Sequence, residues 1–153
     1  MLGGRPNLRR VPPFSVTFRN HPLVPCSDAT NLGLVFDSAL SWDSHVSLVT
    51  RRCFGILSGL SHLRGYLPPR VISALVNALV FTQIRYCISL YGNGSKRNLS
   101  RLQKIINYGA KVVFGRKKFD RASGLLRTLG WLGAEDLVPH PVPHTQGPLS
   151  RGA

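Results

Sequence analysis

The stretch between Pro69 and Gly92 most constrains what this chain can fold into, because its apolar residues would fall on almost every side of a helix. We expect one helix there, from about Arg70 to Tyr91. A helix that is apolar on nearly every side belongs at the centre of a helical bundle. It is also long enough to suggest a membrane span, but Arg85 lies within it, and a charged side chain at mid-membrane costs about 2.5 kcal/mol or more. We therefore expect a buried helix and no membrane partner.

Two more helices are expected beside it. Ser41 or Asp43 can cap the first, whose apolar residues then recur at helical spacing up to Leu63. Ser95 can cap the other, which runs to about Phe114. A short helix over residues 122–129 follows a basic loop.

The two ends of the chain have a different character. Residues 1–13 are rich in Gly, Pro and Arg and predict a flexible lead-in. Residues 14–40 favour short strands, at Ser15–Arg19 and Asn31–Asp37, with a turn at 20–22 between them. Residues 133–153 form a Pro-rich tail that we expect to be disordered. The expected fold is thus mainly α, with a bundle of three to four helices over 41–132, preceded by a short β-hairpin.

Positive charge is concentrated in the helical part of the sequence. The formal net charge is +14, and residues 44–130 hold 15 basic side chains against Asp120 alone, a difference that equals the whole excess. Such a segment repels itself unless an anion such as phosphate lies nearby. A soluble domain with a solvated basic face is the alternative.

The helix expected after Ser95 places much of this charge along one side. At about 100° per residue, Leu99, Leu102, Ile106, Ala110 and Val113 fall on one side of it. The basic ladder falls on the other side and consists of Arg97, Arg101, Lys104, Tyr108 and Lys111. It continues into a basic loop with Arg116, Lys117, Lys118 and Arg121. Cations one turn apart can follow a phosphate backbone while a tyrosine stacks on a sugar or base, so these nine residues are the predicted nucleic-acid site.

No catalytic or metal constellation accompanies the ladder. The six carboxylates are scattered, and Asp37 and Asp43, which flank a helix start, are expected to be caps rather than metal ligands. We expect no enzyme activity, no metal and no cofactor. Three widely spaced cysteines and the lack of an apolar leader predict an intracellular protein, nuclear or cytoplasmic and not secreted.

Several blocks in order resemble a known family over roughly residues 14–132. They are NLGLVFDSALSWDSHV (31–46), LRGYLPP (63–69), LVNALVFTQIRYCISLYGN (75–93), LSRLQKIINYGAKVVFG (99–115) and LLRTLGWL (125–132). This succession resembles the segment that follows the palm in reverse transcriptases of non-LTR, LINE-type retrotransposons.

The resemblance implies a closing palm strand at Leu32 and Gly33, and then a thumb that holds the template and primer by their backbone. Arg97, Arg101, Lys104 and Lys111 would be its backbone contacts. The family's catalytic carboxylates lie upstream of such a segment, and nothing here matches them. The expected function is therefore non-catalytic binding of RNA, DNA or a hybrid by a fragment of an RNA-directed DNA polymerase. The alternative is a degenerate or protein-interaction fragment whose apolar helix packs on a missing palm domain.

Overall fold

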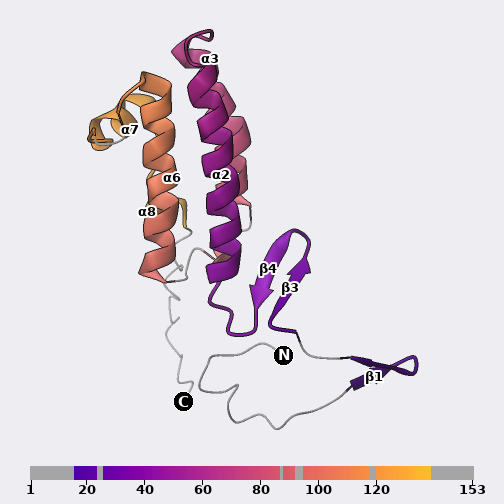
Figure 1. Ribbon diagram of the computed structural model, residues 1–153. Coiled ribbons are helices and arrows are strands. Elements are labelled where there is room, and N and C mark those ends of the chain that lie inside the picture. Colours follow the sequence, from indigo (N-terminus) through magenta and orange to yellow (C-terminus); the bar gives the residue numbers. More distant parts are fainter. Residues whose placement is uncertain (1–15, 24–25, 87, 92–94, 118–119, 139–153) are drawn as a thin grey trace, which may run out of the picture.

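The computed structural model describes residues 16–23, 26–86, 88–91, 95–117 and 120–138. Over these residues the chain is mostly helical, with two small antiparallel hairpins before the helices (Figure 1). The expectation of a mainly α chain with strands near its N-terminus is therefore confirmed. The lead-in at 1–13 and the part of the predicted tail from residue 139 onward lie outside the described residues.

Both hairpins close through two-residue turns. Strand β1 (Val16–Phe18) pairs with β2 (His21–Leu23), and β3 (Asp28–Asn31) pairs with β4 (Leu34–Asp37). The expected turn at 20–22 was wrong, because Arg19 and Asn20 make it and both have positive φ angles, 48° and 64°. The expected single run over 31–37 was also wrong. Leu32 (φ 49°) and Gly33 (φ 79°) break it, since a tight hairpin turn of this kind needs positive φ at both central residues.

The first long helix, α2 (Asp43–Leu63), starts from a loop organised by Asp37. The Asp37 carboxylate accepts hydrogen bonds from the backbone N–H groups of Ala39 (3.1 Å), Ser41 (2.9 Å) and Trp42 (2.7 Å). The predicted N-cap at Ser41 or Asp43 was wrong by a residue, because Trp42 holds the cap position in the left-handed region, φ 63°. Burial raises the pKa of Asp37, but the hydrogen bonds from Ser41, Trp42 and Ala39 outweigh it and hold that pKa below its ordinary value. Asp37 therefore shapes a loop.

The β3–β4 hairpin is fixed to α2 by a buried histidine. The backbone N–H of Val35 donates to Nδ1 of His45 at 3.4 Å, and the rings of Phe36 and Trp42 meet with centroids 5.1 Å apart. Burial, and then the nearby charge of Arg52, lower the pKa of His45. A neutral imidazole, which can accept at Nδ1, suits this position.

The apolar stretch is not one regular helix. It consists of α3 (Pro69–Val76), a π-helical turn η1 (Asn77–Phe81), α4 (Thr82–Arg85) and α5 (Ile88–Tyr91). The predicted unbroken helix over 70–91 was wrong, because the backbone leaves helical geometry at Tyr86, with ψ at 111°. There the Tyr86 hydroxyl donates to the carbonyl oxygen of Leu32 at 2.6 Å, so the break ties the stretch to the hairpin turn.

Nor does this stretch occupy the centre of the fold. Ile72 and Ile84 are fully buried, but Val71, Leu79 and Leu90 are 37%, 44% and 50% exposed. One side packs and the other faces outward, so the expectation of a central helix was wrong. In the described part of the chain, no helix combines the length and apolarity that crossing a membrane requires.

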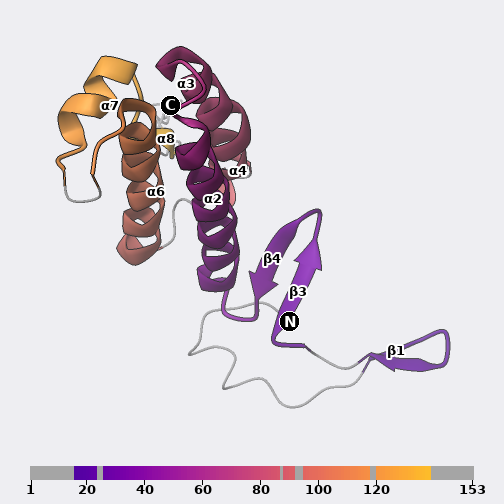
Figure 2. The same ribbon diagram turned by 45° about the horizontal axis from the view of Figure 1, so that its top comes forward.

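Helices α2 and α6 (Lys96–Phe114) lie side by side, with α3 and α4 packed against them (Figures 1 and 2). The buried side chains between them are aliphatic; they include Val46, Leu57, Ile72, Val76, Ile105 and Ile106. Gly109 allows a close approach, because a Cβ there would lie 3.2 Å from Val76 Cγ1 and 3.4 Å from Trp131 Cζ3. The packing of α6 against its neighbours thus depends on a glycine at position 109.

Two short helices pack against α6 and complete the described part of the fold. Helix α7 (Ser123–Leu129) ends at Gly130, close to its predicted bounds, and Trp131 then packs edge-on against Phe81 with centroids 4.8 Å apart. Helix α8 (Ala134–Leu137) lies where we expected a disordered tail from residue 133. That expectation was wrong for residues 133–138, because Ala134 is buried and its N–H donates to Oε1 of Gln103 at 2.7 Å.

Candidate nucleic-acid interface

Helix α6 begins and ends where local chemistry predicts. Ser95 is the N-cap, and its hydroxyl accepts from the backbone N–H of Asn98 at 3.3 Å. Gly115 ends the helix in the left-handed conformation at φ 67°, which glycine adopts without a steric penalty. Between these ends the helix buries its apolar side in the core, so its polar side is fixed in direction.

The five ladder positions of α6 share this polar side. Arg97 and Lys104 are exposed, whereas Arg101, Tyr108 and Lys111 are half-buried. The half-buried residues lie along the border with α2. There Nη2 of Arg101 donates to the Ser47 hydroxyl at 3.0 Å, which holds this guanidinium against the neighbouring helix. The ladder therefore runs beside α2 rather than along the middle of an open face.

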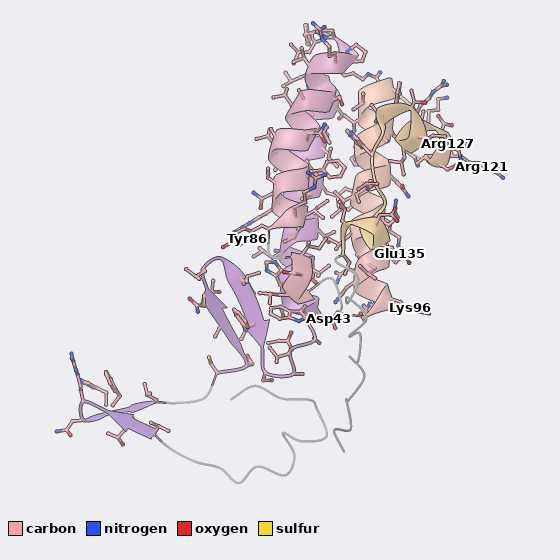
Figure 3. All side chains as sticks on the ribbon, turned by 180° about the vertical axis from the view of Figure 1, so that it is seen from behind. Asp43, Tyr86, Lys96, Arg121, Arg127 and Glu135 are labelled. Atoms are coloured by element: carbon pink, nitrogen blue, oxygen red, sulfur yellow. The ribbon has the colours of Figure 1, made fainter. Side chains whose placement is uncertain are left out.

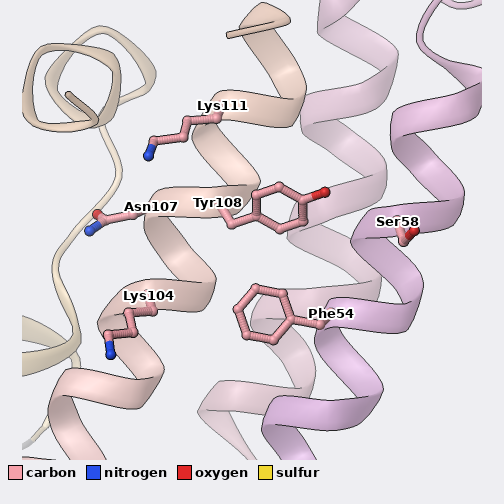
Figure 4. Close-up of a pocket in the computed structure, with 6 residues that line it drawn as sticks. All are labelled: Phe54, Ser58, Lys104, Asn107, Tyr108 and Lys111. Carbon is pink, nitrogen blue, oxygen red and sulfur yellow. The ribbon is translucent and has the colours of Figure 1, made fainter. Parts of the chain in front are cut away.

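An open groove lies where the ladder meets α2 (Figure 4). Its volume is about 550 Å³, and its lining consists of Phe54 and Ser58 from α2 and Lys104, Asn107, Tyr108 and Lys111 from α6. The rings of Phe54 and Tyr108 lie between the two helices, with centroids 5.6 Å apart and planes at 39°. Lys104 and Lys111 also line the groove, and Figure 4 shows their side chains projecting from α6 away from the two rings. The groove thus combines an aromatic floor with a cationic edge.

None of the six lining residues is acidic. The basic loop continues the positive charge past the end of α6, with Arg116, Lys117 and Arg121 exposed. In this loop the Asp120 carboxylate accepts the backbone N–H of Lys117 at 2.9 Å. Lys118 lies outside the described residues. Figure 3 shows Lys96 at the start of α6 and Arg121 to the side of its C-terminal half, and α6 is about 28 Å long.

Sequence reasoning missed the contribution of α2 to this groove. Phe54 does not belong to the apolar stripe that predicts α2, and it is 36% exposed. Ser58 follows it by one turn on the same side. An aromatic residue that falls outside a helix's apolar stripe was the available signal, but its pairing with Tyr108 depends on how α2 and α6 pack.

A second hollow, about 620 Å³, lies on the other side of α6 and differs in charge. Lys96 and Lys104 line it together with Glu135 and Asp136 of α8. The Asp136 carboxylate accepts the backbone N–H of Gly133 at 3.0 Å, so it serves the start of α8. Among the described residues, no group of three or more His, Cys, Asp or Glu side chains could hold a metal ion. This second hollow lacks the uniform charge of the groove.

Comparisons of the chain with known protein families, with curated proteins and with solved structures found no match. The resemblance to the post-palm segment of LINE-type reverse transcriptases therefore stays a prediction from the sequence blocks.

Proposed function

We propose that this chain is a non-catalytic nucleic-acid-binding module, similar to the thumb of a LINE-type reverse transcriptase, that holds RNA, DNA or a hybrid by its backbone. Its helices would form the expected thumb-like bundle of three to four helices. The observation that carries the proposal is the basic ladder of α6 beside a groove whose lining contains no acid. Cations in a row along one helix match a row of phosphates, and each phosphate they neutralise releases a counterion.

The arrangement of the ladder supports backbone binding rather than base reading. Arg101 is held by Ser47, and Lys104 is exposed on the groove edge. Cations at fixed positions on a rigid helix set the register of a strand without distinguishing bases. The module is therefore expected to bind different sequences alike.

The proposal is tested by the salt dependence of binding to a labelled oligonucleotide, followed by fluorescence anisotropy. If four phosphates of a single strand are neutralised, affinity should fall by about 50-fold between roughly 50 and 200 mM salt. Changing Arg101, Lys104 and Lys111 together to Ala should weaken binding by about 10- to 100-fold and flatten that salt dependence.

The matched control removes the same charge elsewhere. Arg52, Arg70 and Arg85 are also exposed cations, and none of them lines the groove. Changing these three to Ala should weaken binding far less than the ladder variant. Equal losses of affinity in the two variants would mean that net charge alone drives binding. An affinity that does not change with salt would refute the proposal.

A second candidate rests on the outward apolar side chains of the α3–α5 stretch. Val71, Leu79 and Leu90 are each more than a third exposed. They favour a fragment whose apolar side packs on a palm-type polymerase domain and which has no independent function. That candidate predicts self-association of the isolated chain in size-exclusion chromatography. It also predicts a melting temperature that rises with an added palm domain and stays unchanged with RNA.

A further inference from the structure

The aromatic floor of the groove has no role in holding a phosphate backbone. Phe54 is 36% exposed, and the ring of Tyr108 is half-buried against it. Cations alone bind phosphates, so a surface that binds only a backbone does not need two aromatic rings at its centre. The rings offer an apolar face to any flat, apolar group placed in the groove.

Two lysines flank Tyr108 along α6. Lys104 and Lys111 are seven residues apart on α6, which separates them by about 10 Å along the helix axis. Tyr108 lies between them, one turn after Lys104. A ligand with an anionic group on either side of a flat ring would bring its anions to the two lysines and its ring to Tyr108 and Phe54.

A strand of nucleic acid is a ligand of this kind, provided that its bases are unpaired. In a duplex the faces of the bases are stacked on each other and cannot reach a protein ring, whereas a single strand exposes them. The groove is open and about 550 Å³ in volume, which leaves room for a base to lie on the aromatic floor.

We infer that the groove binds single-stranded nucleic acid, with an unpaired base stacked on Phe54 and Tyr108 and the flanking phosphates at Lys104 and Lys111. This inference rests on the proposed function and adds to it the class of ligand, a single strand rather than a duplex. Stacking on a ring tolerates every base, because each base has a flat π face. The 2′-hydroxyl takes no part in it, so RNA and DNA strands should show the same dependence on bases.

The test compares three ligands of equal length, about 12 nucleotides, on the unaltered chain. They are a single strand of adenines, an abasic strand with the same phosphates, and a blunt duplex; the base-bearing strand and the duplex are prepared as DNA and as RNA. The base-bearing strand should bind about 5- to 150-fold more tightly than the abasic strand. It should also bind more tightly than the duplex. Equal affinity for the base-bearing and abasic strands, or tighter binding of the duplex, overturns the inference but leaves the proposed function standing. Failure of all ligands to bind overturns both.

Variants then place the effect in the groove. Phe54→Leu and Tyr108→Leu should each reduce the preference for the base-bearing strand over the abasic one, while binding of the abasic strand stays the same. Phe114→Leu and Tyr66→Leu are matched controls, because these residues are 38% and 85% exposed and neither lines the groove. If the control variants reduce the preference as much as the groove variants do, stacking occurs elsewhere and the inference fails.

Discussion

Gly109 is the point at which the packing of α6 can be tested most directly. A Cβ added there would lie 3.2 Å from Val76 Cγ1, 3.4 Å from Trp131 Cζ3 and 3.7 Å from Leu57 Cδ2. The distance to Val76 is shorter than an ordinary van der Waals contact and the distance to Trp131 is at the lower limit of one, so Val76 must move to accept a methyl group. Gly59 on α2 has no atom within 4 Å of the same position.

The two glycines form a matched pair, because Ala at either site adds one methyl group to a helical glycine. At Gly59 the change should raise the free energy of unfolding by about 0.5–1 kcal/mol, since Ala is the better helix former. At Gly109 the close contacts oppose this gain, and overpacking costs about 1–3 kcal/mol. Gly109→Ala should therefore be less stable than Gly59→Ala by about 1–3 kcal/mol, and Gly109→Val, with two further methyl groups, should be less stable still.

Urea unfolding followed by far-UV circular dichroism measures the difference. With a slope of about 1–3 kcal/mol per molar urea, a difference of about 2 kcal/mol separates the two midpoints by about 1 M. Equal gains in stability for Gly109→Ala and Gly59→Ala would refute the close packing of α6 against α3 and Trp131. The relation of Phe54 to Tyr108 depends on the same packing, so the groove would then have to be reconsidered.

Two further predictions concern buried titratable groups. Burial and Arg52 lower the pKa of His45 below its ordinary 6.5, so the unfolded chain binds more protons as pH falls below that value. Stability should therefore decrease from about pH 7 to pH 5, and His45→Asn, which keeps an acceptor but does not titrate, should weaken that decrease in urea titrations. Burial raises the pKa of Cys53 to about 11, whereas Cys26 is exposed. A thiol reagent at about pH 8 should label Cys26 quickly and Cys53 only in urea, as peptide mass spectrometry would show; rapid labelling of native Cys53 would contradict its burial.

The sequence predicted best those features that depend on nearby residues. Ser95 and Gly115 mark the ends of α6 because capping and a left-handed C-terminus are local properties of the chain. Periodicity also separated the buried side of α6 from its ladder, because one side of a helix packs wherever the partner lies. The side of α6 that carries the ladder was thus predictable from the sequence.

Features that depend on distant contacts were not predictable in this way. The helix break at Tyr86 accompanies a hydrogen bond to Leu32, which lies 54 positions earlier in the sequence. Leu32 itself adopts a positive φ, which leucine seldom does, so the residue type gave no sign of a turn at this position. The pairing of Phe54 with Tyr108 likewise joins two helices that are far apart in the sequence. Half of the groove was therefore missing from the predicted site.

The hydrogen bonds of three carboxylates affect the rate at which this chain can associate with a ligand. Asp37, Asp120 and Asp136 each accept a backbone N–H of their own loop, and none of them lines the groove beside the basic ladder. On the groove side of α6 the positive potential then extends into solvent without an acidic side chain in the lining. Such a field accelerates the diffusional encounter with a polyanion and allows a bound chain to slide along it before it settles.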